Sequence, residues 1–156
     1  MADAKTIEMI KNELSRLLNA LEFPFSKLEV VEEKNGIVRA NIDTERAPFL
    51  IGTFGERVNA LQHLLKNILW KKIDEKIFLV VDVDHYRKSR EEKMMALAEE
   101  KIAAAAETKI PQKMPVLEPY LRRMIHLFIA EKNPDGVTSE SRGEGDERRL
   151  FVIPKN

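Results

Sequence analysis

The chain has 156 residues, of which 44% are hydrophobic and 33% are charged, a composition typical of a globular protein with one ordinary domain or two small ones. It contains no cysteine, which excludes disulfides, zinc ribbons and thiol catalysis. The 26 basic and 26 acidic residues cancel to a formal net charge of zero, so any nucleic-acid binding must use a local basic patch.

Several kinds of segment and site are absent from the sequence. No apolar run approaches about 18 residues, and MADAKTIEMI at the N-terminus has no apolar signal core, so we expect a cytoplasmic protein without membrane insertion. The histidines, His63, His85 and His126, are scattered and no carboxylate cluster accompanies them, so we expect no metal site. No nucleophile elbow, Walker loop or paired general acid and base occurs, so we expect neither an enzyme nor a cofactor.

The first half of the chain predicts six elements in the order helix, strand, strand, helix, helix, strand. Apolar residues at helical spacing define the helices, and Asn35-Gly36 between the first two strands is a strong hairpin signal. The last strand, IFLVVDV, is almost continuously apolar, so we expect it at the centre of a sheet. The six ranges are 4–21, 27–34, 37–42, 44–51, a helix that follows Gly55 and runs to about Lys72, and 77–83. Of these, 44–51 is interrupted by Pro48 and is either a short helix or an irregular lead-in to the loop.

A Gly-x-x-Gly loop at residues 52–55 leads directly into the fifth element. Glycines permit the positive φ angles of a tight loop, and a helix start presents free main-chain N–H groups and the positive end of the helix dipole. This geometry suits a phosphate group, and a plain turn is the alternative interpretation. The residues that we expect to contact a nucleic acid here are Gly52, Thr53, Phe54, Gly55, Arg57, Asn59 and Gln62.

The second half begins with a long helix over residues 86–107, which is rich in the helix formers Glu, Lys and Ala. The proline-containing segment 111–119 indicates an edge strand, and Pro119 then starts another helix. Residues 137–154 predict a hairpin across Gly143-Glu144-Gly145. Three arginines that this hairpin brings toward one end are Arg142, Arg148 and Arg149.

The helix that follows Pro119 carries a second candidate site. Arg122 and His126 are one turn apart and share a side of the helix, and Arg123 adds another cation. A guanidinium and an imidazole on one patch suit a phosphate group. The alternative interpretation is structural, with Arg122 paired to Glu118 and His126 a buried, hydrogen-bonded imidazole.

Four separated segments of the chain resemble one protein family. They are LIGTFGERVNALQHL (50–64), DVDHYRKSREE (82–92), VLEPYLRRMIH (116–126) and SESRGEGDERRLFVIP (139–154). In this order they are similar to the bacterial Jag family, also called KhpB or SpoIIIJ-associated protein. Arg122 and His126 fit the Arg-x-x-x-His signature of that family's R-3-H domain. The resemblance covers nearly the whole chain.

The resemblance implies an α+β fold in two domains. Residues 1–84 are expected to form a type II KH domain, with the element order α-β-β-α-α-β and the Gly-x-x-Gly loop at 52–55. Residues 85–156 are expected to form a small α/β R-3-H domain, joined through the long helix 86–107.

The resemblance also implies a function. It predicts a single-stranded RNA-binding protein, a post-transcriptional regulator that uses the loop and the R-3-H basic patch. Family members usually carry basic residues between the loop glycines, whereas this chain has Thr53-Phe54, followed by Glu56, which repels phosphate. The alternatives are an adaptor that pairs with a small KH-only protein, and single-stranded DNA binding through the R-3-H half.

Overall fold

The computed structural model describes residues 2–73, 77–132, 134 and 136–155. The chain divides into two compact units, Met1–Lys88 and Ser89–Asn156. The division falls within the long helix α4 (Tyr86–Thr108), just after the domain boundary expected between residues 84 and 85. Each unit combines helices with a small sheet, which confirms the expected α+β class.

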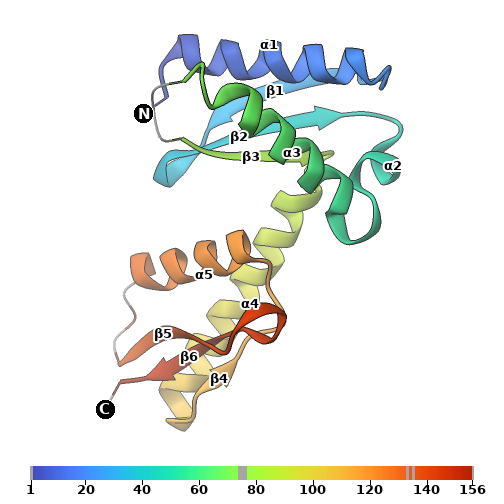
Figure 1. The fold of residues 1–156 in the computed structure, drawn as a ribbon. Coiled ribbons are helices and arrows are strands. Elements are labelled where there is room, and N and C mark those ends of the chain that lie inside the picture. The colour runs from blue at the N-terminus through green and yellow to red at the C-terminus, as the bar shows by residue number, and fades with distance from the viewer. Residues whose placement is uncertain (1, 74–76, 133, 135, 156) are drawn as a thin grey trace. The chain divides into compact units, whose positions relative to one another are not determined.

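The first unit contains the predicted order of helix, strand, strand, helix, helix and strand. The sheet order is β1-β2-β3, with β1 antiparallel to β2 and β2 parallel to β3. A parallel pair requires a crossover connection, and here α2, the loop and α3 occur between β2 and β3. The elements are α1 (Ala4–Ala20), β1 (Lys27–Glu32), β2 (Ile37–Asp43), α2 (Ala47–Ile51), α3 (Glu56–Leu69) and β3 (Phe78–Val83) (Figure 1).

The expectation that residues 77–83 form the central strand is wrong. In the described part of the sheet the central strand is β2, and β3 lies at an edge. The apolar sequence of β3 reflects burial rather than a central position, because Leu79, Val81 and Val83 contribute to the core that α1 and α3 cover. Burial and strand order are separate properties, and an apolar run reports only the first.

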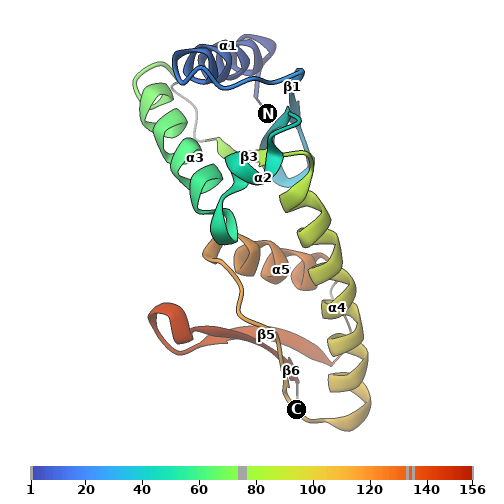
Figure 2. The same ribbon diagram turned by 90° about the vertical axis from the view of Figure 1, so that its right-hand side faces the viewer.

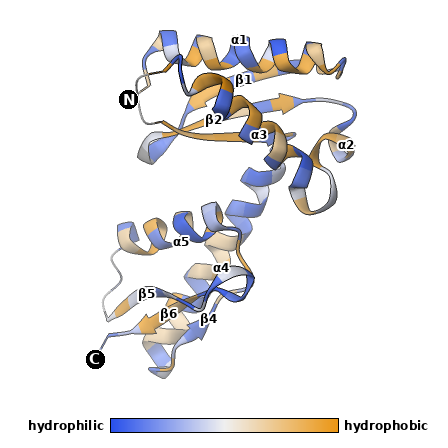
Figure 3. Ribbon diagram, in the orientation of Figure 1, coloured by the Kyte–Doolittle hydropathy of each residue, from blue (hydrophilic) through white to orange (hydrophobic). Residues whose placement is uncertain are grey.

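The helices α1 and α3 pack on one side of this sheet (Figures 1 and 2). Ile10, Leu14 and Leu18 are fully buried and recur every four residues along α1, so they form a single apolar stripe. The Asp3 side chain caps this helix, because it accepts a hydrogen bond from the main-chain N–H of Thr6 at 2.6 Å. Figure 3 shows the alternation of hydrophobic and hydrophilic residues along α1 and α3 that allows this packing.

The opposite side of the sheet carries a buried polar network around Asp82. This carboxylate is fully buried and accepts hydrogen bonds from the main-chain N–H groups of Arg87 at 2.8 Å and Lys88 at 3.0 Å. It also accepts from the Val83 N–H at 2.8 Å and from Nη1 of the buried Arg39 at 3.2 Å. Asp82 therefore fixes the first turn of α4 and links it to β2.

The second unit consists of an antiparallel sheet and two helices. The sheet order is β4-β6-β5, and a 3-10 turn over Gly145–Glu147 lies between β5 and β6, which confirms the predicted hairpin. The small residues Ala98 and Ala105 of α4 are fully buried against Leu121 and Ile125 of the next helix and its sheet. Besides α4, the elements are β4 (Gln112–Lys113), α5 (Pro119–Lys132), β5 (Val137–Arg142) and β6 (Arg149–Pro154).

Replacing Asp82 by Ala should lower the free energy of unfolding by about 3 kcal/mol or more, because it leaves the N–H donors of Val83, Arg87 and Lys88 without their acceptor. Arg39 keeps its ion pair with Glu33 at 2.9 Å. The measurement is urea unfolding followed by circular dichroism. Glu29→Ala is the control, since its ion pair with Lys27 at 3.3 Å is exposed and should contribute less than about 1 kcal/mol. Equal losses in the two variants would contradict the role given to Asp82.

Candidate functional site

The Gly-x-x-Gly loop leaves only part of its main chain open to a ligand. Gly52 and Gly55 have positive φ angles of 72° and 79°, and Phe54 between them has φ of 51°. The Gly52 N–H donates to the Pro48 carbonyl at 3.1 Å, and the Gly55 N–H donates to the Gly52 carbonyl at 3.4 Å. The expectation of free amides at both glycines is therefore wrong, because the tight turn itself uses them.

The two residues between the glycines remain available. Among the residues that the structure describes, none accepts a hydrogen bond from the main-chain N–H of Thr53 or of Phe54. Both side chains are exposed, and the Phe54 ring is 86% exposed. The loop thus combines two open donors with an aromatic ring at its tip, directly before the start of α3.

Asn59 and Gln62 have structural partners that sequence reasoning missed. The Gln62 Oε1 atom accepts from the Val81 N–H at 2.9 Å and from Arg87 Nη1 at 2.7 Å. The Asn59 Oδ1 atom accepts from Arg87 Nη2. The two side-chain oxygens therefore hold α3 to β3 and to the start of α4.

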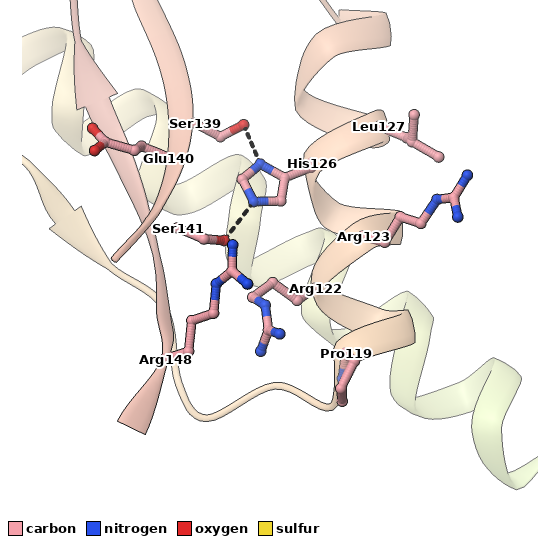
Figure 4. Close-up of a pocket in the computed structure, with 9 residues that line it drawn as sticks. All are labelled: Pro119, Arg122, Arg123, His126, Leu127, Ser139, Glu140, Ser141 and Arg148. Atoms are coloured by element: carbon pink, nitrogen blue, oxygen red, sulfur yellow. Dashed lines mark hydrogen bonds between the residues drawn. The ribbon is translucent and has the colours of Figure 1, made fainter. Parts of the chain in front are cut away.

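A pocket of about 410 Å³ lies in the second unit, between α5 and the β5–β6 hairpin (Figure 4). It gathers guanidinium, imidazole and hydroxyl groups from elements that are separate in the sequence. The residues that line it are Pro119, Arg122, Arg123, His126, Leu127, Ser139, Glu140, Ser141 and Arg148. All three residues expected from the R-3-H signature segment are among them.

His126 is hydrogen-bonded through both ring nitrogens. Its Nδ1 lies 2.8 Å from Ser139 Oγ and its Nε2 lies 2.7 Å from Ser141 Oγ. The two serines are two residues apart on β5, so their side chains share one side of the strand. In a neutral imidazole one nitrogen donates and the other accepts, so one hydroxyl accepts from the ring and the other donates to it.

The pKa of His126 is lowered from its usual value of 6.5. Burial of the ring is the largest cause, and the positive charges of Arg122 and Arg148 also disfavour the imidazolium form. The ring is therefore predominantly neutral at pH 7. An anion in the pocket would offset the two guanidinium charges and raise this pKa.

Arg122 is held by an uncharged acceptor. Its Nη1 donates to the Leu117 carbonyl at 3.1 Å, whereas Glu118 pairs with Arg90 at 2.8 Å. The alternative interpretation of an Arg122–Glu118 pair is therefore wrong. The other part of that alternative, a partly buried and hydrogen-bonded His126, describes the ring correctly. That bonding leaves His126 on the wall of the pocket.

The three arginines of the hairpin have different partners. Arg148 lines the pocket, and Figure 4 shows its side chain beside Ser141 and Arg122, while Arg123 points away from His126. Arg142 instead pairs with Glu140 at 3.3 Å. Arg149 donates to the Asp146 carbonyl at 2.7 Å. The hairpin does bring all three toward one end, since Arg142 is the register partner of Arg149 and Arg148 directly precedes Arg149, but of these three only Arg148 lines the pocket.

Sequence reasoning did not assign Ser139 and Ser141 to the site. The alternation Ser-Glu-Ser on a predicted strand was the available signal, because it places two hydroxyls on one side. With Arg122, Arg123 and Arg148 opposed by Glu140 alone, the residues around the pocket carry a net positive charge while His126 is neutral. Such a pocket suits an anion rich in oxygen acceptors.

Metal-binding clusters and membrane-spanning helices are both absent from the described residues. These residues contain no group of three or more histidine or acidic side chains arranged to hold a metal ion. No helix within them is both long and apolar enough to cross a membrane.

Comparison with known proteins places this pocket within a recognised domain. The family model described as the R-3-H domain matches residues 92–154, which include every residue that lines the pocket.

Curated relatives cover most of the chain. The RNA-binding protein KhpB of Clostridium symbiosum is 26% identical over 151 residues, which are 97% of this chain and 65% of the relative. The RNA-binding protein KhpB of Bacillus subtilis is 29% identical over 80% of this chain and 60% of the relative. That of Lactiplantibacillus plantarum is 32% identical over 78% of this chain and 37% of the relative. The chain thus spans less than two thirds of the length of these relatives.

The lowered pKa of His126 predicts how stability depends on pH. His126 binds its proton more weakly in the folded state than in the unfolded state. The stability that the neutral ring contributes to the folded state is therefore present above pH 6.5 and is lost as the pH falls through the folded-state pKa. Urea unfolding at pH 7.5 and at pH 5.5 should therefore show that the free energy of unfolding falls less with acidification for His126→Gln than for the wild type. A loss of unfolding free energy in His126→Gln as large as that of the wild type would contradict this role of the ring.

Proposed function

We propose that this chain, which contains a match to the R-3-H domain and is similar to KhpB proteins, is a member of the Jag, or KhpB, family: a non-catalytic protein that binds single-stranded RNA and acts as a post-transcriptional regulator. Its relatives carry the name RNA-binding protein. The observation that carries the proposal is the open pocket of the R-3-H domain, where three guanidinium groups, two hydroxyls and an imidazole line one cavity.

The pocket takes a backbone phosphate. No carboxylate of the described residues forms a salt bridge with Arg122 or Arg148, so both keep their charge for a ligand. Guanidinium groups form paired, charge-assisted hydrogen bonds with phosphate oxygens. One serine hydroxyl supplies a further donor while His126 is neutral, and the second hydroxyl hydrogen becomes available when the ring takes up a proton and donates to both Oγ atoms. Arg123, on the outer side of α5, contacts the next part of the strand.

The loop at 52–55 is a second contact with the same polymer. The element order of residues 1–84 supports their interpretation as a type II KH domain, in which such a loop holds the backbone of about four nucleotides. The open N–H groups of Thr53 and Phe54 bind phosphate oxygens, and the exposed Phe54 ring stacks on a base. The Asn59 and Gln62 amide groups lie along the helix that follows and donate to base edges.

Two other functions compete with RNA binding. Single-stranded DNA offers the same phosphates, so competition between RNA and DNA strands of one sequence distinguishes the polymers, which differ at the 2′-hydroxyl. An adaptor that pairs with a KH-only protein is favoured by Trp70 and Leu64, which are 80% and 49% exposed at or near the end of α3. Under that alternative, the purified chain would capture the partner protein and retain no RNA.

Replacing Arg148 by Gln should weaken RNA binding roughly tenfold, because a hydrogen bond to a charged group is worth about 1.5 kcal/mol or more. The slope of log K against log salt should also become shallower by about 0.7, the value for one phosphate of a single strand. Fluorescence anisotropy with a labelled single-stranded RNA at several salt concentrations measures both quantities. Arg142→Gln is the matched control on the same hairpin, and an equal effect from it would argue against the pocket.

Replacing Gly55 by Asp should abolish the loop's contribution to RNA affinity, because it places a carboxylate at the start of α3, where it would repel a backbone phosphate. Positive φ alone strains any side chain there, so Gly36→Asp is the matched control. Gly36 has φ of 71°, close to the 79° of Gly55, and a Cβ atom at either position meets no atom within 3.4 Å. Wild-type RNA affinity in Gly55→Asp, with its unfolding midpoint equal to that of Gly36→Asp, would remove the loop from the proposed interface.

A further inference from the structure

The loop at 52–55 lacks a positive charge of its own. Thr53 and Phe54 lie between the glycines, and Glu56 follows them. A phosphate held only by two main-chain N–H groups would also meet the Glu56 carboxylate. A compensating cation must therefore come from a side chain that reaches the loop from outside it.

The Arg57 side chain runs directly against the loop. A Cβ atom added to Gly52 would lie 2.7 Å from Arg57 Cγ and 3.1 Å from its Cδ, which is closer than such atoms approach. Position 52 therefore requires glycine for two reasons: its φ angle is positive, and the aliphatic part of the Arg57 side chain occupies the space that a Cβ atom would take. This packing directs the arginine back across the loop rather than into open solvent.

Phe49 of α2 holds the end of that side chain. The Arg57 guanidinium carbon lies 4.3 Å from the centroid of the Phe49 ring, and Nη1 donates to the Phe49 carbonyl at 2.8 Å. The Phe49 ring is stacked on Phe23, with centroids 6.1 Å apart and planes at 15°. Phe23 is a core residue, so the arginine is supported by a continuous stack that begins in the core.

These contacts hold Arg57 without neutralising it. An aromatic ring and a carbonyl oxygen are its partners, and no carboxylate of the described residues forms a salt bridge with it. An unrestrained arginine loses much rotamer freedom when it binds a ligand. A guanidinium that is already fixed loses less, so its hydrogen bonds to a phosphate contribute more to affinity.

We infer that Phe49 is a positioning residue of the loop site, which holds the Arg57 guanidinium beside residues 52–55 as the cation that contacts a bound phosphate. This inference rests on the proposed function, since it assigns the loop's ligand as a polynucleotide phosphate. The inference gives a role to Phe49, which is 61% exposed on the short helix α2. The sequence pattern assigned no role to this residue.

The test is a double-mutant cycle on the full chain, with the RNA affinity and the salt slope measured by anisotropy on a labelled single-stranded RNA. Arg57→Gln should weaken binding about three- to tenfold and reduce the slope by about 0.7. Phe49→Leu should weaken binding by a similar factor although it removes no charge. The double variant should bind no more weakly than Arg57→Gln alone, because Phe49 acts through Arg57. Phe49→Trp, which keeps an aromatic face for the guanidinium, should retain wild-type affinity.

Trp70→Leu is the matched control, because it removes another highly exposed aromatic ring of the same unit. Additive effects of Phe49→Leu and Arg57→Gln would overturn the inference, as would a lowered unfolding midpoint in Phe49→Leu with unchanged affinity and slope. Either result leaves RNA binding by the wild type intact, so the proposed function would survive. A wild-type chain that binds no RNA would overturn the proposed function and this inference together.

Discussion

The buried carboxylate of Asp82 is the constraint on which the geometry of the first unit depends. It fixes the main chain of Arg87 and Lys88 at the start of α4. The Arg87 side chain then binds the side-chain oxygens of Asn59 and Gln62, which sets the position of α3. Since the Gly-x-x-Gly loop ends where α3 begins, this carboxylate acts together with the packing of α3 in the core to constrain where the loop's open amides lie.

A common rule separates the cations of the candidate sites from other cations of the chain. Arg39, Arg90 and Lys132 form salt bridges with carboxylates, so that internal partners compensate their positive charges. Arg57 and Arg122 are held by main-chain carbonyl oxygens instead. A chain with a net charge of zero therefore still presents positive charge at two defined places, because it fixes those side chains with neutral acceptors.

The sequence was sufficient for the elements that depend on local patterns. Helical spacing, Asn35-Gly36 and Pro119 predicted the order of elements, and Arg122 with His126 located the pocket. The position of β3 at a sheet edge was not predictable, because apolar content does not encode strand order. The roles of Asn59 and Gln62 were also missed, since their partner Arg87 lies far along the chain and only the fold brings the three together.

The pair of serines around His126 allows the ring to change its charge without any movement of the backbone. Hydroxyl groups rotate freely about the Cβ–Oγ bond, so each can accept from or donate to a ring nitrogen. When the imidazole is neutral, one hydroxyl hydrogen points at the ring. When it is protonated, both hydroxyl hydrogens turn outward, and the wall of the cavity gains a donor at the same moment as it gains a charge. Proton uptake by the ring and the availability of this hydroxyl donor are thus coupled through the rotation of a single O–H group.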